Sequence, residues 1–237
     1  MEALCEWGLQ GVRHLGRRAD ALVVVDVLSF STAVDIAVSR GASIYPYPGI
    51  DEGLPRFARE VRAELGGRRG ECRFSLSPAC YLDVERGTRI ALPSVNGGAV
   101  TRAAASGRVF TACLRNAAAV AHAAASANTV AVIPAGERWP DGSLRPCIED
   151  WLGAGAVIRH LGGADSAEAA AAREMFRAVA DQIGTLLHDS VSGRELVDQG
   201  YQEDVALAAE LNVSDAAPVL RDGAYVHLDV RPEQGSP

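Results

Sequence analysis

The stretch Pro134–Asp150 holds a dense set of side chains able to do polar chemistry. It contains four acids and two arginines: Glu137, Arg138, Asp141, Arg145, Glu149 and Asp150. Pro140-Asp141-Gly142 is typical of a rigid turn, because proline fixes φ and glycine tolerates positive φ. Ser143 is expected to cap the helix that follows, on which Arg145 and Glu149 would share one face. A solvated loop with a surface ion pair is the simpler interpretation. Charges of alternating sign on a rigid turn instead favour a site that binds both an anion and a cation.

The elements that position these residues alternate between apolar runs and helical stretches. This alternation predicts an α/β fold, three-layer α/β/α, with a mainly parallel or mixed central sheet and a helical C-terminal third. The expected strands are 21–27, 43–47, 89–93, 108–114 and 129–134, with 226–230 as a last strand at an edge. We expect one domain over 1–237, or two lobes that break in the Gly/Arg-rich stretch near 66–75.

Polar or glycine residues follow four of the expected strands. They are Asp26 with Ser29, Ser31 and Thr32; Asn96 with Gly97; Arg115 with Asn116; and Glu137 with Arg138. Ligands of open α/β sheets bind beyond the carboxyl ends of the strands, where helix N-termini favour anions. Each set alone is most simply a helix cap, but four at one sheet edge predict a site. The expected catalytic residues are Asp26, Arg115, Glu137 and Arg138. Substrate binding is expected from Ser29, Ser31, Thr32, Asn96, Gly97, Asn116 and Arg145.

Acids at this edge would repel an anionic substrate unless a cation lay between them. Mg²⁺ suits such oxygen ligands, because it is held by one or two carboxylates together with substrate phosphate. Glu137 and Asp141 are the expected magnesium ligands, with Glu149 or Asp150 in support. Arg138 and Arg145 are expected to clamp the phosphoryl oxygens. The residues therefore predict a Mg²⁺-assisted site for a small phosphorylated acid.

Composition excludes several other classes of protein. The 237-residue chain has no lysine, which removes Schiff-base catalysis and the phosphate-loop lysine, although arginine still binds phosphate. A net charge of −7 argues against non-specific nucleic-acid binding. No apolar run suits a bilayer and the N-terminus is no signal peptide, so no membrane association and a cytoplasmic location are expected. The five cysteines have irregular spacing and are interpreted as structural thiols. A homodimer is left open.

Other catalytic signatures fail on inspection. Cys80 to Arg86 has the spacing of cysteine phosphatases, but the acids between them could hardly stabilise a thiolate. Asp26-Val-Leu lacks the second aspartate of aspartyl-phosphate phosphatases. The first strand is not followed by G-x-G-x-x-G, which disfavours a nucleotide-binding enzyme.

Several segments resemble the 2-phosphosulfolactate phosphatase family. They are Asp26–Ala33, Ser94–Gly97, Cys113–Ala117, Pro134–Asp150 with Leu152–Ile158, Ser192–Leu196 and Asp222–Tyr225. The resemblance runs from about residue 20 to residue 226. It implies a Mg²⁺-dependent phosphatase that converts 2-phospho-3-sulfolactate to sulfolactate in coenzyme M biosynthesis. The alternative is a catalytically altered paralogue, or a binding module that kept the anion pocket.

Two positions depart from the family pattern. Arginine often follows Asp-Val-Leu in the family, where this chain has Ser29. A segment that often ends Gly-Asn-Ser-Pro is here Ser75-Leu-Ser77-Pro78. Losing a forked guanidinium contact predicts weaker discrimination for the sulfonate than in relatives with the arginine.

Overall fold

The computed structural model describes residues 1–104 and 107–228, whose strands form one large mixed sheet. The strand order is β10-β1-β7-β2-β6-β11-β12-β3-β5-β4. The bounds are β1 (Glu2–Cys5), β2 (Ala21–Val25), β3 (Ser43–Tyr47), β4 (Glu64–Leu65), β5 (Arg89–Pro93), β6 (Arg108–Ala112), β7 (Thr129–Pro134), β10 (Ala164–Asp165), β11 (Pro218–Arg221) and β12 (Ala224–His227). The predicted α/β class with a mixed central sheet is confirmed.

Strand β2 lies at the centre of the parallel half of the sheet. It pairs with β6 on one side and β7 on the other, and all its residues are buried. Val23 and Val25 pack into the cluster on one face, while Leu22 and Val24 pack into the cluster on the other. This alternation follows from the two-residue period of a strand. Helices therefore cover both faces of β2, and the chain leaves the sheet at Asp26.

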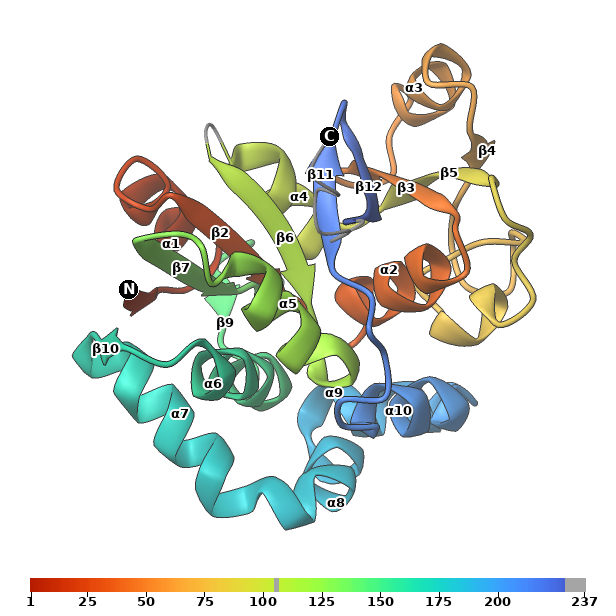
Figure 1. The fold of residues 1–237 in the computed structure, drawn as a ribbon. Helices are drawn as coiled ribbons and strands as arrows, with labels where there is room; N and C mark the ends of the chain where they lie inside the picture. The colour runs from red at the N-terminus through yellow and green to blue at the C-terminus, as the bar shows by residue number, and fades with distance from the viewer. Residues whose placement is uncertain (105–106, 229–237) are drawn as a thin grey trace, which may run out of the picture.

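The helices form the outer two layers around the sheet (Figure 1). Their bounds are α1 (Gly8–Leu15), α2 (Phe30–Ser39), α3 (Leu54–Glu60), α4 (Gly97–Ala103), α5 (Ala117–Ala124), α6 (Ile148–Leu161), α7 (Ala167–Val179), α8 (Ile183–Asp189), α9 (Val191–Asp198) and α10 (Gln202–Ala209). Helices α5, α6 and α7 share the cluster of Val23, and α1 and α4 share that of Leu22. The three-layer arrangement and the helical character of the C-terminal third are thus as predicted.

The hairpin of β11 and β12 is inserted between β6 and β3. The prediction of an edge strand at 226–230 was therefore wrong: β12 lies inside the sheet, and residues 229 and 230 fall outside the described part of the chain. Asp222 and Gly223 both have positive φ, of 49° and 80°. This is the geometry of a two-residue turn whose twist matches the flanking strands, and Asp-Gly favours it.

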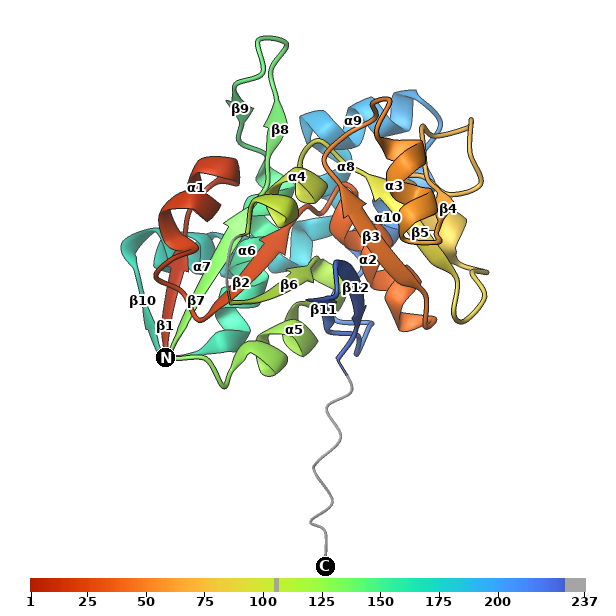
Figure 2. The same cartoon turned by 90° about the horizontal axis from the view of Figure 1, so that it is seen from above.

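The stretch after β7 folds as a second, small hairpin rather than running into a helix. Strands β8 (Glu137–Arg138) and β9 (Leu144–Arg145) pair antiparallel, and the hairpin projects from the body of the protein (Figure 2). Gly142 has φ 81° in its turn, where the Trp139 N–H donates to the carbonyl of Ser143 at 2.9 Å. The Pro-Asp-Gly turn therefore reverses the chain.

Helix α6 begins at Ile148, five residues beyond Ser143. The expected cap by Ser143 was therefore wrong, and its hydroxyl instead donates to Asp141 at 2.6 Å. Arg145 and Glu149 do not share a helical face, because Arg145 belongs to β9. Among the described residues, no helix is long and apolar enough to cross a membrane.

Candidate active site

Asp26 follows β2 and is held by two backbone N–H groups. Phe30 donates to its Oδ1 at 3.2 Å, and Gly97 donates to its Oδ2 at 2.8 Å. The first donor lies at the start of α2, and the second lies at the start of α4. The carboxylate is buried, 5% exposed as a residue. Two loops after different strands therefore converge on one side chain, as expected for Asp26 and Gly97.

Asp150 fixes the neighbouring loops in the same manner from the first turn of α6. Its Oδ1 accepts a hydrogen bond from Val27 N–H at 2.7 Å, and its Oδ2 accepts one from Gly136 N–H at 2.8 Å. An acid in the first turn of a helix is favoured by the helix dipole. Asp150 therefore joins the loops after β2 and β7, and its support of a magnesium ion stays a prediction.

Four carboxylates interact electrostatically at this edge: Asp26, Glu137, Glu149 and Asp150. Burial, followed by the charge of Glu137, raises the pKa of Asp26 to about 7, although its backbone hydrogen bonds oppose the shift. Burial and the charges of Asp26 and Glu149 raise the pKa of Asp150 well above its usual value. Burial is also the main cause of the raised pKa of Glu149. Such a cluster binds a proton or a cation more readily than isolated acids do.

The charge of Arg145 acts on this cluster. It partly opposes the rise that burial causes in the pKa of Glu149. Its side chain is 13% exposed, and its Nη2 lies 3.4 Å from Ser192 Oγ and 3.6 Å from Glu195 Oε2. The guanidinium also lies over the ring of Trp139. Arg145 is therefore half enclosed between the small hairpin and α9.

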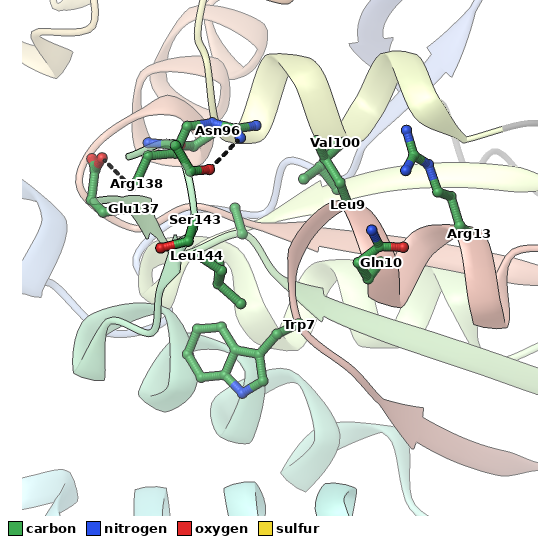
Figure 3. A pocket seen from close by; sticks show the side chains of 12 residues that line it. Trp7, Leu9, Gln10, Arg13, Asn96, Val100, Glu137, Arg138, Ser143 and Leu144 are labelled. Carbon is green, nitrogen blue, oxygen red and sulfur yellow. Dashed lines mark hydrogen bonds between the residues drawn. The ribbon is translucent and has the colours of Figure 1, made fainter. Parts of the chain in front are cut away.

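Arg138 lies on the outside of the same hairpin. Its Nε and Nη2 donate to the carbonyl of Val95 at 3.2 and 3.1 Å, and its Nη1 donates to that of Gly142 at 3.4 Å. Figure 3 shows Arg138 beside Asn96, in the wall of a cavity of about 240 Å³. Trp7 and Arg13 also line this cavity, which does not include Asp26 in its wall. We place the reaction at the cluster of four carboxylates and not in this cavity, because the cavity wall does not contain the whole cluster.

Two of the expected substrate-binding hydroxyls are used inside the protein. Ser31 Oγ accepts from Asp26 N–H at 2.9 Å and lies 2.7 Å from Thr111 Oγ1. Thr32 Oγ1 donates to the carbonyl of Val27 at 2.7 Å. Both residues are buried, so they shape the loop that presents Asp26. Direct substrate binding by these two hydroxyls stays a prediction.

Arg115 and Asn116 do not join the cluster, contrary to prediction. Arg115 Nε donates to Asp35 Oδ2 at 3.0 Å, and its Nη1 pairs with Glu210. Asn116 Oδ1 accepts from Cys113 N–H at 2.9 Å. Parallel strands place their carboxyl ends at one edge, but the side chains after β6 turn towards α2 and α10. Arg115 therefore pairs with a buried acid, and a contact between Arg115 and the substrate stays a prediction.

Asp141 is also misplaced in the sequence-based site. It lies in the exposed turn of the small hairpin, where Ser143 N–H and Oγ both donate to its Oδ1. These bonds lower the pKa of Asp141, the reverse of the buried acids. These bonds close the turn, so we expect Glu137 and Glu149, rather than Asp141, to hold magnesium.

Sequence reasoning missed the pair Arg69 and Asp204. Arg69 Nη2 donates to Ser29 Oγ at 2.7 Å, and its Nε donates to Asp204 Oδ2 at 3.3 Å. Arg69 lies in the Gly/Arg-rich stretch that was interpreted as a break between lobes. Two adjacent arginines between glycines were the signal available, because glycines let a loop approach other backbone closely.

Mg²⁺ fits the donor chemistry of Glu137 and Glu149. Within residues 1–104 and 107–228, no three acid, histidine or cysteine side chains form a ready metal cage. Mg²⁺ does not need one, since it usually keeps several waters and binds one or two carboxylates with substrate phosphate. The mutual repulsion of the acids is what a cation would relieve.

The sheet, the buried carboxylates and the adjacent guanidinium groups are those of an α/β/α protein with a cluster of charged groups at one edge of its sheet. The chain belongs to the 2-phosphosulpholactate phosphatase family, whose model matches residues 11–223. A Symbiobacterium thermophilum protein named "Probable 2-phosphosulfolactate phosphatase" is 31% identical over 223 residues, 87% of this chain and 94% of its own. The Methanothermobacter thermautotrophicus "2-phosphosulfolactate phosphatase" is 29% identical over 85% of this chain and 87% of its own. The chain is thus a phosphoric monoester hydrolase, as predicted.

Proposed function

We propose that the protein is a Mg²⁺-dependent phosphatase of a small acidic phosphate ester, with 2-phospho-3-sulfolactate as its substrate. The observation that carries the proposal is the carboxylate cluster around Asp26, in which burial and neighbouring acids raise the pKa of Asp26, Glu149 and Asp150. Family membership supports the phosphate ester, and the names of the relatives support the sulfolactate. In the bacterial or archaeal pathway that such relatives imply, the product would serve coenzyme M biosynthesis.

The residues divide into three roles in this proposal. Glu137 and Glu149 would hold Mg²⁺, which would neutralise charge on the phosphoryl oxygens. Arg145 stabilises the charge that spreads over the transferring group, because its guanidinium stands beside Glu149 and is half enclosed. Arg138 lies at the rim and can reach a phosphate only by releasing the carbonyl of Val95.

Asp26 is placed to accept a proton from the attacking water. The two N–H donors fix the direction of its oxygens, and burial, the largest cause of its raised pKa, favours the proton that it would take up. Water adds its oxygen to phosphorus, the ester bond breaks, and the alcohol leaves with a proton. The products are the hydroxy acid and inorganic phosphate.

Phosphate release from 2-phospho-3-sulfolactate and from p-nitrophenyl phosphate, with Mg²⁺ or with EDTA, tests the proposal. We expect turnover of both esters with Mg²⁺ and none with EDTA. Turnover unaffected by EDTA would contradict the role of the metal. Binding of the esters without any phosphate release would favour the alternative, a family member that kept the anion pocket and lost the reaction.

A further inference from the structure

Arg69 brings a guanidinium to the loop that carries Asp26. Its Nη2 donates to Ser29 Oγ at 2.7 Å and to the carbonyl of Leu76 at 3.1 Å. Ser29 immediately precedes Phe30, whose N–H donates to Asp26 Oδ1. The positive group is therefore linked to the proposed general base through one hydrogen bond and one short stretch of backbone.

The opposite edge of this guanidinium is anchored by a buried acid. Arg69 Nε donates to Asp204 Oδ2 at 3.3 Å, and Ser77 Oγ donates to Asp204 Oδ1 at 2.6 Å. The side chain of Asp204 is 1% exposed, and that of Arg69 is 20% exposed. Within the described residues Nη1 of Arg69 has no hydrogen-bond partner. Because the guanidinium of Arg69 is already held in place, its side chain loses little further entropy when an anion binds its free N–H groups.

A cavity of about 360 Å³ opens beside Arg69. Its wall includes Arg68 and Tyr201, together with Pro93 at the end of β5 and the acid Glu71. Arg68 is exposed and has no ion pair within the described part of the chain. Gly97, four residues after Pro93, donates to Asp26, so the cavity wall includes the end of the strand that leads into one of the two loops holding this carboxylate.

We propose that Arg69, with Arg68 at the rim, forms a second anion subsite for the carboxylate or sulfonate of the substrate. The phosphoryl group would lie at the carboxylate cluster while the acidic end points to Arg69. This inference rests on the proposed phosphatase function and makes Arg69 a specificity-determining residue. A phosphate ester without a carboxylate or sulfonate would not use it.

Both segments that depart from the family pattern contact Arg69. Ser29 Oγ accepts a hydrogen bond from Arg69 Nη2, and so does the carbonyl of Leu76, one of the two residues that depart in the second segment. A guanidinium from residue 69 thus occupies the neighbourhood of residue 29. Weaker discrimination for the sulfonate stays a prediction, which the comparison of acidic esters also tests.

Steady-state hydrolysis of three esters tests the subsite: p-nitrophenyl phosphate, 2-phospholactate and 2-phospho-3-sulfolactate, all with Mg²⁺. Arg69→Ala should raise KM for the ester or esters whose acidic group is bound by about tenfold to hundredfold, the loss expected for hydrogen bonds to a charged group. p-Nitrophenyl phosphate, which has no carboxylate or sulfonate, should be affected much less than the acidic esters. Arg73→Ala is the matched control, because Arg73 lies in the same segment and its contacts are an exposed pair with Glu64 and the ring of Phe74, away from Ser29 and Asp204.

The esters whose KM rises in Arg69→Ala identify the acidic group that Arg69 binds. A KM effect on both acidic esters assigns Arg69 to the carboxylate, and an effect on the sulfonate ester alone assigns it to the sulfonate. An equal loss on all three esters, with a lower melting temperature, would show that Arg69 only supports the fold and would overturn the subsite. Arg69→Lys guards against misfolding, since it keeps the positive charge and should lie between the wild type and Arg69→Ala.

Calorimetric titration with lactate and 3-sulfolactate gives a readout that needs no turnover. Arg69→Ala should bind the preferred acid about tenfold or more weakly than the wild type. Equal binding by both proteins would overturn the subsite even if hydrolysis succeeds. If no ester is hydrolysed yet binding still depends on Arg69, the phosphatase proposal fails while the anion site stands.

Discussion

The backbone N–H of Gly97 donates a 2.8 Å hydrogen bond to Oδ2 of Asp26, 71 positions earlier in the chain. This contact ties the loop after β5 to the loop after β2. A methyl group at residue 97 would lie 2.4 Å from Cδ1 of Phe30 and 2.8 Å from Asp26 Oδ2. The glycine is needed here for the close approach of two loops, since no side chain fits between them.

Gly97→Ala should therefore reduce phosphate release sharply and lower stability by about 1–3 kcal/mol, the usual cost of overpacking. Melting temperature and specific activity of the purified variant check this. Gly184→Ala is the control, because a methyl group at that position of α8 meets no atom within 4 Å and alanine favours helix. Wild-type turnover in Gly97→Ala would show that the contact is not needed for catalysis.

The strands were predictable because they are buried on both faces and read as continuous apolar runs. Ala21–Val25 and Thr129–Pro134 needed no information beyond their own residues. The small hairpin was missed because Pro140-Asp141-Gly142 can equally precede a helix or reverse a chain. Only the pairing of Glu137 with Arg145 decides between these outcomes.

Polar partners distant in sequence were the part that could not be predicted. Arg115 has the same local context as the other residues after strands, but Asp35 and Glu210 engage it from 80 and 95 positions away. Asp204 gave no signal at all, because its importance comes from contacts with Arg69 and Ser77. Strand ends locate a site edge, whereas tertiary packing decides which side chains reach it.

The acid cluster predicts a pH-dependent stability in the absence of metal. The pKa of Asp26 rises from 3.8 to about 7 on folding, so the folded protein retains a proton that the unfolded chain loses. The resulting stabilisation is complete below the unfolded pKa and is lost as pH rises through about 7. The raised pKa values of Glu149 and Asp150 act in the same direction.

We therefore expect the melting temperature in EDTA to fall as the pH increases from about 5.5 to about 8. Asp26→Asn should reduce this slope, and Mg²⁺ should recover melting temperature most at the alkaline end. Differential scanning calorimetry across this range measures all three effects. A melting temperature that rises with pH in EDTA would contradict the mutual repulsion of these carboxylates.

The cysteines should be dispensable for catalysis. Burial raises the pKa of the Cys113 thiol to about 12 and also raises that of Cys80, so neither is a ready thiolate. Cys80→Ser and Cys113→Ser should keep wild-type turnover in their folded fractions. Iodoacetamide should label the exposed Cys72 first without loss of activity, as mass spectrometry beside the assay would show. Inactivation that tracks labelling of Cys80 would argue for a thiol mechanism.

Glu137 and Asp141 should now differ in their response to magnesium. Glu137→Gln keeps the shape and removes a charge that raises the pKa of Asp26, so it should increase the Mg²⁺ concentration needed for activation. Excess Mg²⁺ should restore part of the rate. Asp141→Asn should leave the magnesium dependence unchanged, because Asp141 serves the exposed turn. Titration of activity against Mg²⁺ tests the pair, and equal shifts in both variants would return Asp141 to the metal site.

Arg145 and Arg138 separate the catalytic from the supporting cation. Arg145 is 13% exposed and acts on Glu149, whereas Arg138 is exposed and donates to the carbonyl of Val95. Arg145→Ala should lower kcat by about hundred- to thousand-fold, as expected when charge stabilisation of the transition state is lost, and Mg²⁺ should not rescue it. Arg138→Ala should mainly loosen the small hairpin and lower kcat much less.

Because Arg145 also contacts Ser192 and Glu195, melting temperature must be measured beside kcat. Glu195→Gln removes the exposed ion pair alone and serves as the control for that structural contribution. If Arg145→Ala loses stability while its folded fraction keeps normal turnover, the catalytic role belongs elsewhere, and a large kcat loss in Arg138→Ala would move it to the rim.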